Sequence, residues 1–340
     1  MTDKVAQAGA AQDGGRIMRA RPQAACYVCG ALGTLLYRNL TDSLFGAPGA
    51  WSMRRCSSER CGLIWLDPMP IEDDLHLAYQ EYYTHGEAEK SARYRAGRLL
   101  YRLASDAILA TVGIPMERRR AKLMFLGDAR PGKVLDVGCG NGEFLVAMRK
   151  RGWRVTGLDV DPAAVATARS AHGLEVHLGT VGSLLSKGLT FDAITASHVI
   201  EHVPDPVEFL THCRQLLRAG GLLVLRTPNA QSFGLRRYGS AWRDLDPPRH
   251  LHIFTASALA ECAARAGFVL SRCFTSAASA DTILSASRCI ARRGSFRESE
   301  LAPSEKLSNW LVRPALALRA KLAWLRERSS GEEICAVLSC

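Results

Sequence analysis

The chain has 340 residues and a formal net charge of +11, with 47% hydrophobic and 23% charged residues. This balance predicts a soluble globular protein with a core of ordinary size. It excludes a membrane-spanning chain, since no apolar run approaches the roughly 20 residues that cross a bilayer. The best candidate, residues 314–325, is interrupted by Arg319 and Lys321. Residues 1–25 lack the apolar block of a secretory signal, so we expect a disordered tail and a cytoplasmic protein.

Four of the eleven cysteines form two short-spaced pairs, and the other seven are scattered. A glycine, Gly30 or Gly62, follows each pair at once and suits a tight metal-binding turn. This arrangement is typical of a zinc ribbon, in which four thiolates leave no open position for a substrate, so we predict a structural zinc ion. The alternative is a set of buried free cysteines. The predicted ligands are Cys26, Cys29, Cys56 and Cys61, in a zinc-ribbon-like segment of residues 26–66.

A glycine-rich turn follows the short apolar strand that we predict at residues 134–137. Gly138, Gly140 and Gly142 tolerate unusual backbone angles and let a ligand approach the main chain. The next predicted strand ends at Asp159, whose carboxylate can accept two hydrogen bonds from a ribose diol. Together these features predict a nucleoside-binding site.

The glycine spacing separates two kinds of nucleoside site. A dinucleotide fingerprint, G-x-G-x-x-G, counted from Gly138 requires a glycine at position 143, where the chain has Glu143. That carboxylate lies at the start of a predicted helix and would repel a pyrophosphate. The nicotinamide-dependent interpretation is therefore disfavoured, and the plainest alternative is a turn that binds no ligand.

Short apolar strands and helices alternate further along the chain. This alternation predicts a parallel sheet with helices on both faces, which is an α/β fold. The predicted strands are residues 154–158, 175–178, 191–196 and 222–225, and the predicted helices are residues 162–171 and 206–218. The sequence Ala219-Gly220-Gly221 is the signal that ends the second helix.

Several motifs together resemble bacterial class I S-adenosylmethionine (SAM) methyltransferases. They are the G-x-G-x-G turn after Asp136, the block Cys61-Gly-Leu-Ile-Trp-Leu-Asp-Pro68, the run His198-Val-Ile-Glu-His202, and residues 242–252. The resemblance covers about residues 26–275. Members of this group often act in the biosynthesis of cell-surface glycans, and some sugar C-methyltransferases also carry an N-terminal zinc segment.

The resemblance implies a Rossmann-like, seven-stranded sheet that ends in an antiparallel hairpin, residues 268–274 and 332–338. The expected order is a disordered tail (1–25), the zinc-ribbon-like segment (26–66), a helical lid or linker (67–130), the SAM-binding core (131–275), a basic amphipathic helical insertion (276–331) and a final core strand (332–340).

The resemblance also implies which residues bind SAM. Many relatives place an acidic residue soon after the third strand to bind adenine, whereas this chain has Gly179-Thr180-Val181-Gly182, which leaves adenine to backbone groups. The expected SAM-binding residues are Asp136, Gly138, Cys139, Gly140, Asn141, Gly142, Asp159, Val160 and His198.

Histidines are the candidates for a catalytic base, since methyl transfer requires removal of the acceptor's proton near neutral pH. His198 and His202 follow the fourth strand, at the sheet edge where ligands of open α/β folds bind. His250 is expected on the same rim, with His252 beside it, and His85 could approach from the lid. We favour His202 or His250 as the base.

A sharper hypothesis places a catalytic divalent metal on His198, Glu201 and His202, because residues at i, i+3 and i+4 share one face of a helical turn. His250 or His252 could supply a fourth ligand. This set resembles the E-x-x-E-H motif of some metal-dependent methyltransferases, with His198 replacing the first glutamate. The alternative is that Glu201 and His202 shape the pocket without a metal.

The expected function is methylation of an oxygen or carbon atom on a small-molecule or glycan-type acceptor, with nucleotide-linked and lipid-linked acceptors included. Basic and apolar residues interleave over residues 306–328, which would also suit contact with an anionic membrane surface. An RNA methyltransferase is the alternative enzyme, although no recognition module supports nucleic-acid binding. A non-catalytic SAM-binding scaffold is the alternative from another class.

Overall fold

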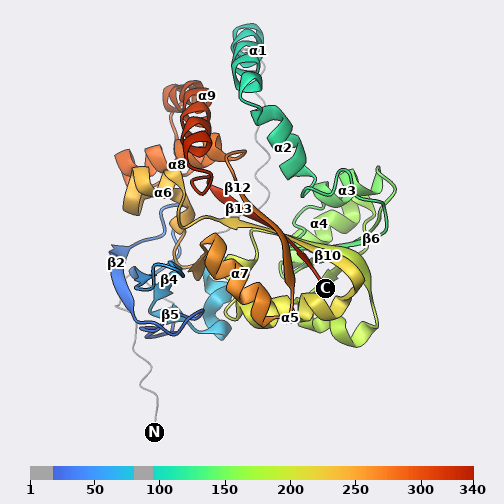
Figure 1. Ribbon diagram of the computed structural model, residues 1–340. Coiled ribbons are helices and arrows are strands. Elements are labelled where there is room, and N and C mark those ends of the chain that lie inside the picture. The colour runs from blue at the N-terminus through green and yellow to red at the C-terminus, as the bar shows by residue number, and fades with distance from the viewer. Residues whose placement is uncertain (1–17, 80–94) are drawn as a thin grey trace.

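A seven-stranded sheet forms the centre of the protein (Figure 1) in a computed structural model that describes residues 18–79 and 95–340. The strand order is β12-β13-β10-β9-β6-β7-β8, with β13 antiparallel to both neighbours and the other pairings parallel. This topology confirms the predicted fold class. The strands are β6 (Lys133–Val137), β7 (Arg154–Asp159), β8 (Val176–Leu178), β9 (Phe191–Ser197), β10 (Leu217–Pro228), β12 (Val269–Ser276) and β13 (Glu333–Ser339).

Helices cover both faces of this sheet because alternate strand residues point to opposite sides. In β10, Leu223 and Leu225 pack in the core shared with α5 and α7, whereas Val224 packs in a separate cluster on the other face. The covering helices are α3 (Glu143–Arg149), α4 (Pro162–His172), α5 (Pro206–Leu216) and α7 (Ala256–Arg265), with the short η3 (Val181–Lys187) preceding β9.

The helix α5 ends two residues before the predicted boundary at residue 218. Leu217 is nearly buried and already pairs with Phe191 at the start of β9. The pairing then shifts register before Leu222, where the predicted strand begins. The tertiary pairing of Leu217 therefore ends the helix before the Gly220-Gly221 signal.

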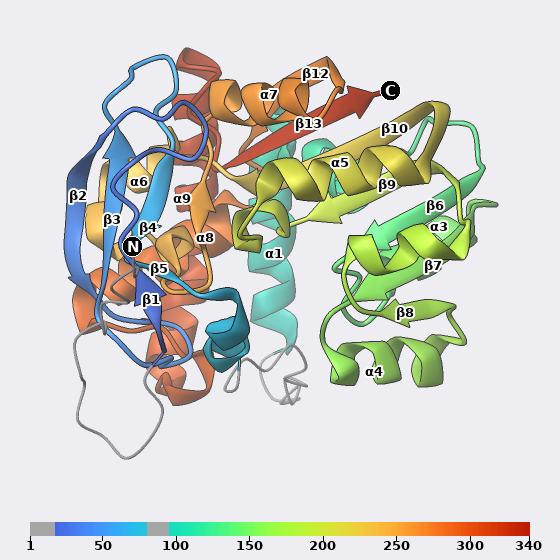
Figure 2. The ribbon, with the colours of Figure 1, turned by 90° about the horizontal axis from the view of Figure 1, so that it is seen from below.

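The N-terminal segment forms a four-stranded antiparallel sheet beside the core (Figure 2). Its strand order is β11-β4-β3-β2, and β11 belongs to the chain that follows β10, so the two parts share one sheet. Residues 18–25 were expected in a disordered tail, yet β1 pairs with β5 there. The strands are β1 (Ala20–Arg21), β2 (Gly33–Leu40), β3 (Trp51–Cys56), β4 (Ile64–Asp67), β5 (Met69–Pro70) and β11 (His252–Ile253).

Helical segments occupy the expected linker and insertion. No helix among residues 18–79 and 95–340 is long and apolar enough to cross a membrane. The buried Lys321 Nζ donates to Glu117 Oε2 at 2.5 Å and so ties α9 to α2. The linker contains η1 (Glu72–Tyr79), α1 (Arg95–Thr111) and α2 (Ile114–Lys122), and the insertion contains α8 (Ala280–Arg293), η7 (Glu298–Glu300) and α9 (Pro303–Arg326). Three further segments, α6 (Phe233–Tyr238), η5 (Gly239–Ala241) and η6 (Arg243–Leu245), lie within the expected core, between β10 and β11.

A buried ion cluster joins the N-terminal sheet to the core. The guanidinium of Arg249 is 1% exposed and donates to both oxygens of Asp42 at 2.8 Å and to both oxygens of Asp246. Asp42 also accepts backbone hydrogen bonds from Leu44 and Phe45. The ion cluster therefore fixes the turn after β2 against the loop before β11.

We expect Arg249→Met to lower the free energy of unfolding by about 3–5 kcal/mol, because it leaves two buried carboxylates without their cation. Urea unfolding of the full chain measures the change. The control is Arg297→Met, which removes an exposed pair with Glu300 and should cost less than about 1 kcal/mol. Equal losses in the two variants would contradict the structural role of Arg249.

Candidate functional site

The glycine-rich turn lies between β6 and α3, at the carboxyl edge of the sheet. Gly138 has φ +71°, and a Cβ atom there would lie 2.7 Å from the side chain of Val199. Gly140 has φ +53°, and no atom lies within 4 Å of the position that its Cβ would take. The turn therefore needs glycine at both positions, and at Gly140 the backbone faces open space that a ligand can enter.

Asp159 ends β7 opposite this turn. Its Oδ2 accepts from the Gly140 N–H at 2.8 Å, and its Oδ1 accepts from the Asp161 N–H at 3.0 Å. Each oxygen keeps a second lone pair for a further donor. The side chain of Val160, the next residue, is 69% exposed and presents an apolar surface beside that carboxylate.

Two other predicted SAM-binding residues, Asn141 and Cys139, have side chains that stabilise the glycine-rich turn. Asn141 Oδ1 accepts from the N–H of Glu143 at the start of α3. The thiol of Cys139 is buried in the cluster that contains Leu145, and burial raises its pKa to about 12. Only the backbone of Cys139 is therefore placed to contact a ligand.

Asp136 is a buried carboxyl group beneath the turn. It is 6% exposed, and the hydroxyl of Thr195 donates to its Oδ1 at 2.6 Å. Burial raises the pKa of Asp136 to about 7, against the lowering effect of that hydrogen bond and with help from the charge of Asp159. A cation bound nearby would favour the ionised form.

His198 follows β9 with φ +56° and lies between two buried carboxylates. Its Nδ1 is 3.1 Å from Glu201 Oε1, and its Nε2 is 2.8 Å from Glu333 Oε1. Burial opposes the charged imidazole, but the two carboxylates outweigh it and raise the pKa of His198 to about 9. With both nitrogens protonated, His198 is a fixed cation and not a proton acceptor.

His202 and His250, unlike His198, are held in the neutral form. Their rings meet edge to face, with centroids 4.7 Å apart. Burial, assisted by the neighbouring His250, lowers the pKa of His202 to about 4, and burial also lowers the pKa of His250. His202 Nδ1 is 3.0 Å from the carbonyl oxygen of Arg249, and His250 Nδ1 is 2.7 Å from that of Asp244. Because a carbonyl only accepts, both Nδ1 atoms carry the proton and both Nε2 atoms keep a lone pair.

Glu201 completes this group, since one ligand atom each from Glu201, His202 and His250 lies within 4.8 Å of the other two. The sequence prediction included His198 among the ligands of a divalent metal, whereas in the structure His250 lies beside Glu201 and His202 instead. His198 is held instead by Glu201 and Glu333. His250 was a candidate fourth ligand of that prediction, and it reaches the group from the loop that precedes β11.

The remaining histidine candidates lie elsewhere. His252 is buried in β11, where its ring packs against Tyr27 and Phe254. His85, the candidate from the expected lid, lies outside the described residues. The sequence reasoning missed Tyr79, whose hydroxyl is 3.0 Å from His202 Nδ1.

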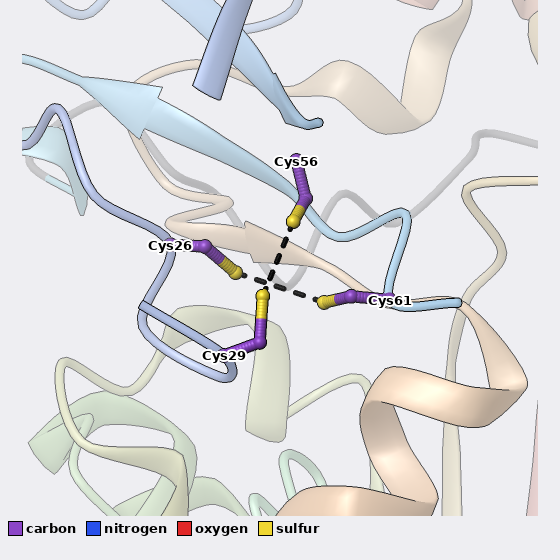
Figure 3. Close-up of side chains that lie close together, drawn as sticks. All are labelled: Cys26, Cys29, Cys56 and Cys61. Carbon is purple, nitrogen blue, oxygen red and sulfur yellow. Dashed lines mark hydrogen bonds between the residues drawn. The ribbon is translucent and has the colours of Figure 1, made fainter. Parts of the chain in front are cut away.

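The four predicted zinc ligands converge in the N-terminal segment (Figure 3). The Cys26 and Cys61 sulfurs are 3.7 Å apart, and the Cys29 and Cys56 sulfurs are 3.3 Å apart. A tetrahedral zinc site with bonds of about 2.3 Å has sulfur–sulfur edges of about 3.8 Å, so the cluster nearly matches that geometry. Burial raises the pKa of Cys26 to about 11, so an isolated thiolate there would be costly without a cation.

Comparison with known proteins agrees with this geometry. Residues 115–272 match a family model described as a methyltransferase domain. The ubiquinone biosynthesis O-methyltransferase of Cereibacter sphaeroides (strain ATCC 17025 / ATH 2.4.3) is 36% identical over 185 residues, which cover 52% of this chain and 71% of that protein. The enzyme of the same name from Xanthomonas oryzae pv. oryzae (strain PXO99A) is 37% identical and covers 37% of this chain and 56% of that protein.

Among solved structures, a SAM-dependent methyltransferase from Archaeoglobus fulgidus is 20% identical, with a TM-score of 0.43, and covers 73% of this chain and all of that one. The chain belongs to the class I SAM-dependent methyltransferases. It is an enzyme, and SAM is its methyl donor.

The buried Asp136 makes the free energy of unfolding depend on pH, and the direction of that dependence follows from its pKa. A folded-state pKa of about 7, above the ordinary value for aspartate, means that the folded state holds the proton more tightly. The stabilising contribution of this group is present below pH 4 and is lost as the pH rises through 7. We expect the stability of Asp136→Asn relative to the native chain to increase by about 1–3 kcal/mol between pH 5 and pH 8.

Urea unfolding at the two pH values measures this difference. Asn keeps an oxygen that can accept from Thr195, so the hydrogen bond is preserved. The exposed Asp128→Asn is the matched control and should show no such increase. A pH-independent difference for Asp136→Asn would show that the carboxyl is ionised throughout.

Proposed function

We propose that SAM binds across the glycine-rich turn and the end of β7. The open space at Gly140 supports this placement, because it lets the ligand reach the backbone. The carboxylate of Asp159 is positioned to accept from the ribose hydroxyls, and the exposed Val160 offers a surface for the adenine ring. Asp136 lies beneath the turn, where its negative charge would complement the cationic end of the cofactor.

We propose O-methylation of a small-molecule acceptor as the reaction. The relatives named as O-methyltransferases support an oxygen nucleophile. The observation that carries the proposal is the neutral His202–His250 pair at the edge of the sheet, with both Nδ1 atoms held by carbonyls. SAM supplies a methyl group that is already activated by the sulfonium charge, so the protein must orient the acceptor and remove one proton.

His202 is the proposed base. Its Nε2 takes the proton of the acceptor hydroxyl as the oxygen–carbon bond forms and the carbon–sulfur bond breaks. The products are the methyl ether, neutral S-adenosylhomocysteine and an imidazolium. His198 stays a cation throughout and helps to hold Glu201 ionised, which lowers the cost of the charge on His202.

A divalent cation on Glu201, His202 and His250 is the second candidate, supported by the convergence of their ligand atoms within 4.8 Å. Carbonyl partners at both Nδ1 atoms are typical of metal-binding histidines. Such an ion would lower the pKa of the acceptor hydroxyl. Under this candidate His202 is a ligand and not the base.

Turnover of SAM with a panel of phenols, catechols and nucleotide-linked sugars, followed by release of S-adenosylhomocysteine, tests the function. We expect His202→Gln to lower kcat by about 10²–10⁴-fold, because an amide cannot take up a proton, while affinity for S-adenosylhomocysteine is unchanged. His172→Gln, on α4, is the control and should retain full activity.

Addition of EDTA separates the two candidates. Activity that survives metal removal assigns His202 as the base, and activity that is lost and restored by a divalent ion assigns the metal. Full activity in His202→Gln would contradict both assignments.

We also propose that Cys26, Cys29, Cys56 and Cys61 hold a structural zinc ion. Their convergence supports this assignment, as do the positive φ angles of Gly30 and Gly62 in the two turns. The ion would stabilise a segment whose own core is small. The eleven free cysteines also favour a reducing compartment, so we propose that the enzyme acts in the cytoplasm.

Metal analysis of the purified chain should find about one zinc ion per chain, and Cys26→Ser with Cys61→Ser should release it. We expect the double variant to expose the N-terminal sheet to limited proteolysis. Cys340→Ser changes an exposed cysteine outside the cluster and is the control. A native protein without zinc would overturn the assignment.

A further inference from the structure

A cavity of about 520 Å³ lies between α6, α8 and α9, which pack side by side (Figure 1). Four arginines line it, one from α6, two from α8 and one from α9. Apolar side chains, including Phe233 and Leu316, form the rest of the lining. The arginines are Arg237, Arg288, Arg292 and Arg319.

The lining carries no compensating negative charge, because no aspartate or glutamate belongs to it. Neighbouring arginines on the same helices do have partners, since Arg236 pairs with Glu327 and Arg293 pairs with Glu305. The four lining arginines form no ion pair within 4.0 Å among the described residues. Four like charges around one cavity repel one another, and an anion bound among them would relieve that repulsion.

Tyr238 also lines the cavity, and the pKa of its phenol responds to the charges of the arginines. Burial and the nearby Glu332 raise the pKa of the Tyr238 phenol, whereas the charges of Arg237, Arg288 and Arg319 act to lower it. A phenolate would thus be favoured by three separate guanidiniums. The same field favours any anion that enters the cavity.

The cavity volume and its chemistry define the class of ligand. A volume of about 520 Å³ exceeds that of a single inorganic phosphate and lies within the range of small-molecule sites. Guanidinium groups bind phosphate oxygens in a bidentate manner. We propose that this cavity binds a phosphorylated small molecule, with its phosphate or diphosphate on the four arginines and an apolar portion against Phe233 and Leu316.

Calorimetric titration of the full chain with pyrophosphate, uridine diphosphate and geranyl diphosphate tests this proposal. We expect at least one of the two organic diphosphates to bind about tenfold more tightly than pyrophosphate, and we expect Arg288→Gln with Arg319→Gln to weaken that binding by about 30-fold or more. Arg326→Gln removes an exposed charge from the same helix outside the cavity, and binding should be unchanged. Arg319→Gln alone, at an exposed side chain, should give an intermediate loss.

Three results would overturn the proposal. They are diphosphate binding weaker than millimolar in the native chain, equal losses in Arg326→Gln and the cavity variants, and organic diphosphates that bind no more tightly than pyrophosphate. Binding to anionic lipid vesicles in the absence of diphosphate binding would also overturn it, since the ligand would then be a membrane surface. Titration with S-adenosylhomocysteine in every variant verifies folding, and it tests the cofactor site independently of this cavity.

Discussion

The buried guanidinium of Arg249 is the interaction that joins the two parts of this enzyme. It bridges Asp42, from the N-terminal segment, and Asp246, from the loop that precedes β11. A cation so buried is stable only with carboxylate partners on both sides, so the N-terminal segment and the core depend on each other for folding. The carbonyl oxygen of Arg249 also holds the Nδ1–H of His202, and His250 is the next residue. The same ion cluster therefore positions the two histidines of the site.

The side chains packed around each histidine, more than its place in the sequence, decide its charge. His198 and His202 belong to one short motif, yet His198 lies between two carboxylates and is a cation, whereas His202 has carbonyl and histidine neighbours and is neutral. Glu201 links the two, because its Oε1 contacts His198 Nδ1 and one of its oxygens lies within 4.8 Å of a ring nitrogen of His202. One buried carboxylate thus couples a fixed cation to the proposed base.

Features encoded by local spacing could be predicted from the sequence, and those that depend on distant partners could not. The glycine-rich turn, Asp159 and the paired cysteines are short patterns with direct geometric meaning. By contrast, the pairing of Arg249 with Asp42 and the strand β11 arise from residues far apart in the chain. His250 was expected on the same rim of the sheet, but its place in the candidate metal site instead of His198 also depends on distant contacts. The end of α5 shows the same limit, since the Gly220-Gly221 signal was weaker than the tertiary pairing of Leu217.

The strand β11 has a consequence for how this enzyme can be divided. The region that matches the methyltransferase family begins at residue 115, which would invite a truncated chain containing that region alone. Such a chain would lose the strand β4 that pairs with β11 and would uncover the buried Ile253 and Phe254. It would also leave Arg249 without Asp42. The catalytic unit, in the sense of protein engineering, therefore includes the N-terminal sheet, and grafting that sheet onto another methyltransferase would require transfer of β11 as well.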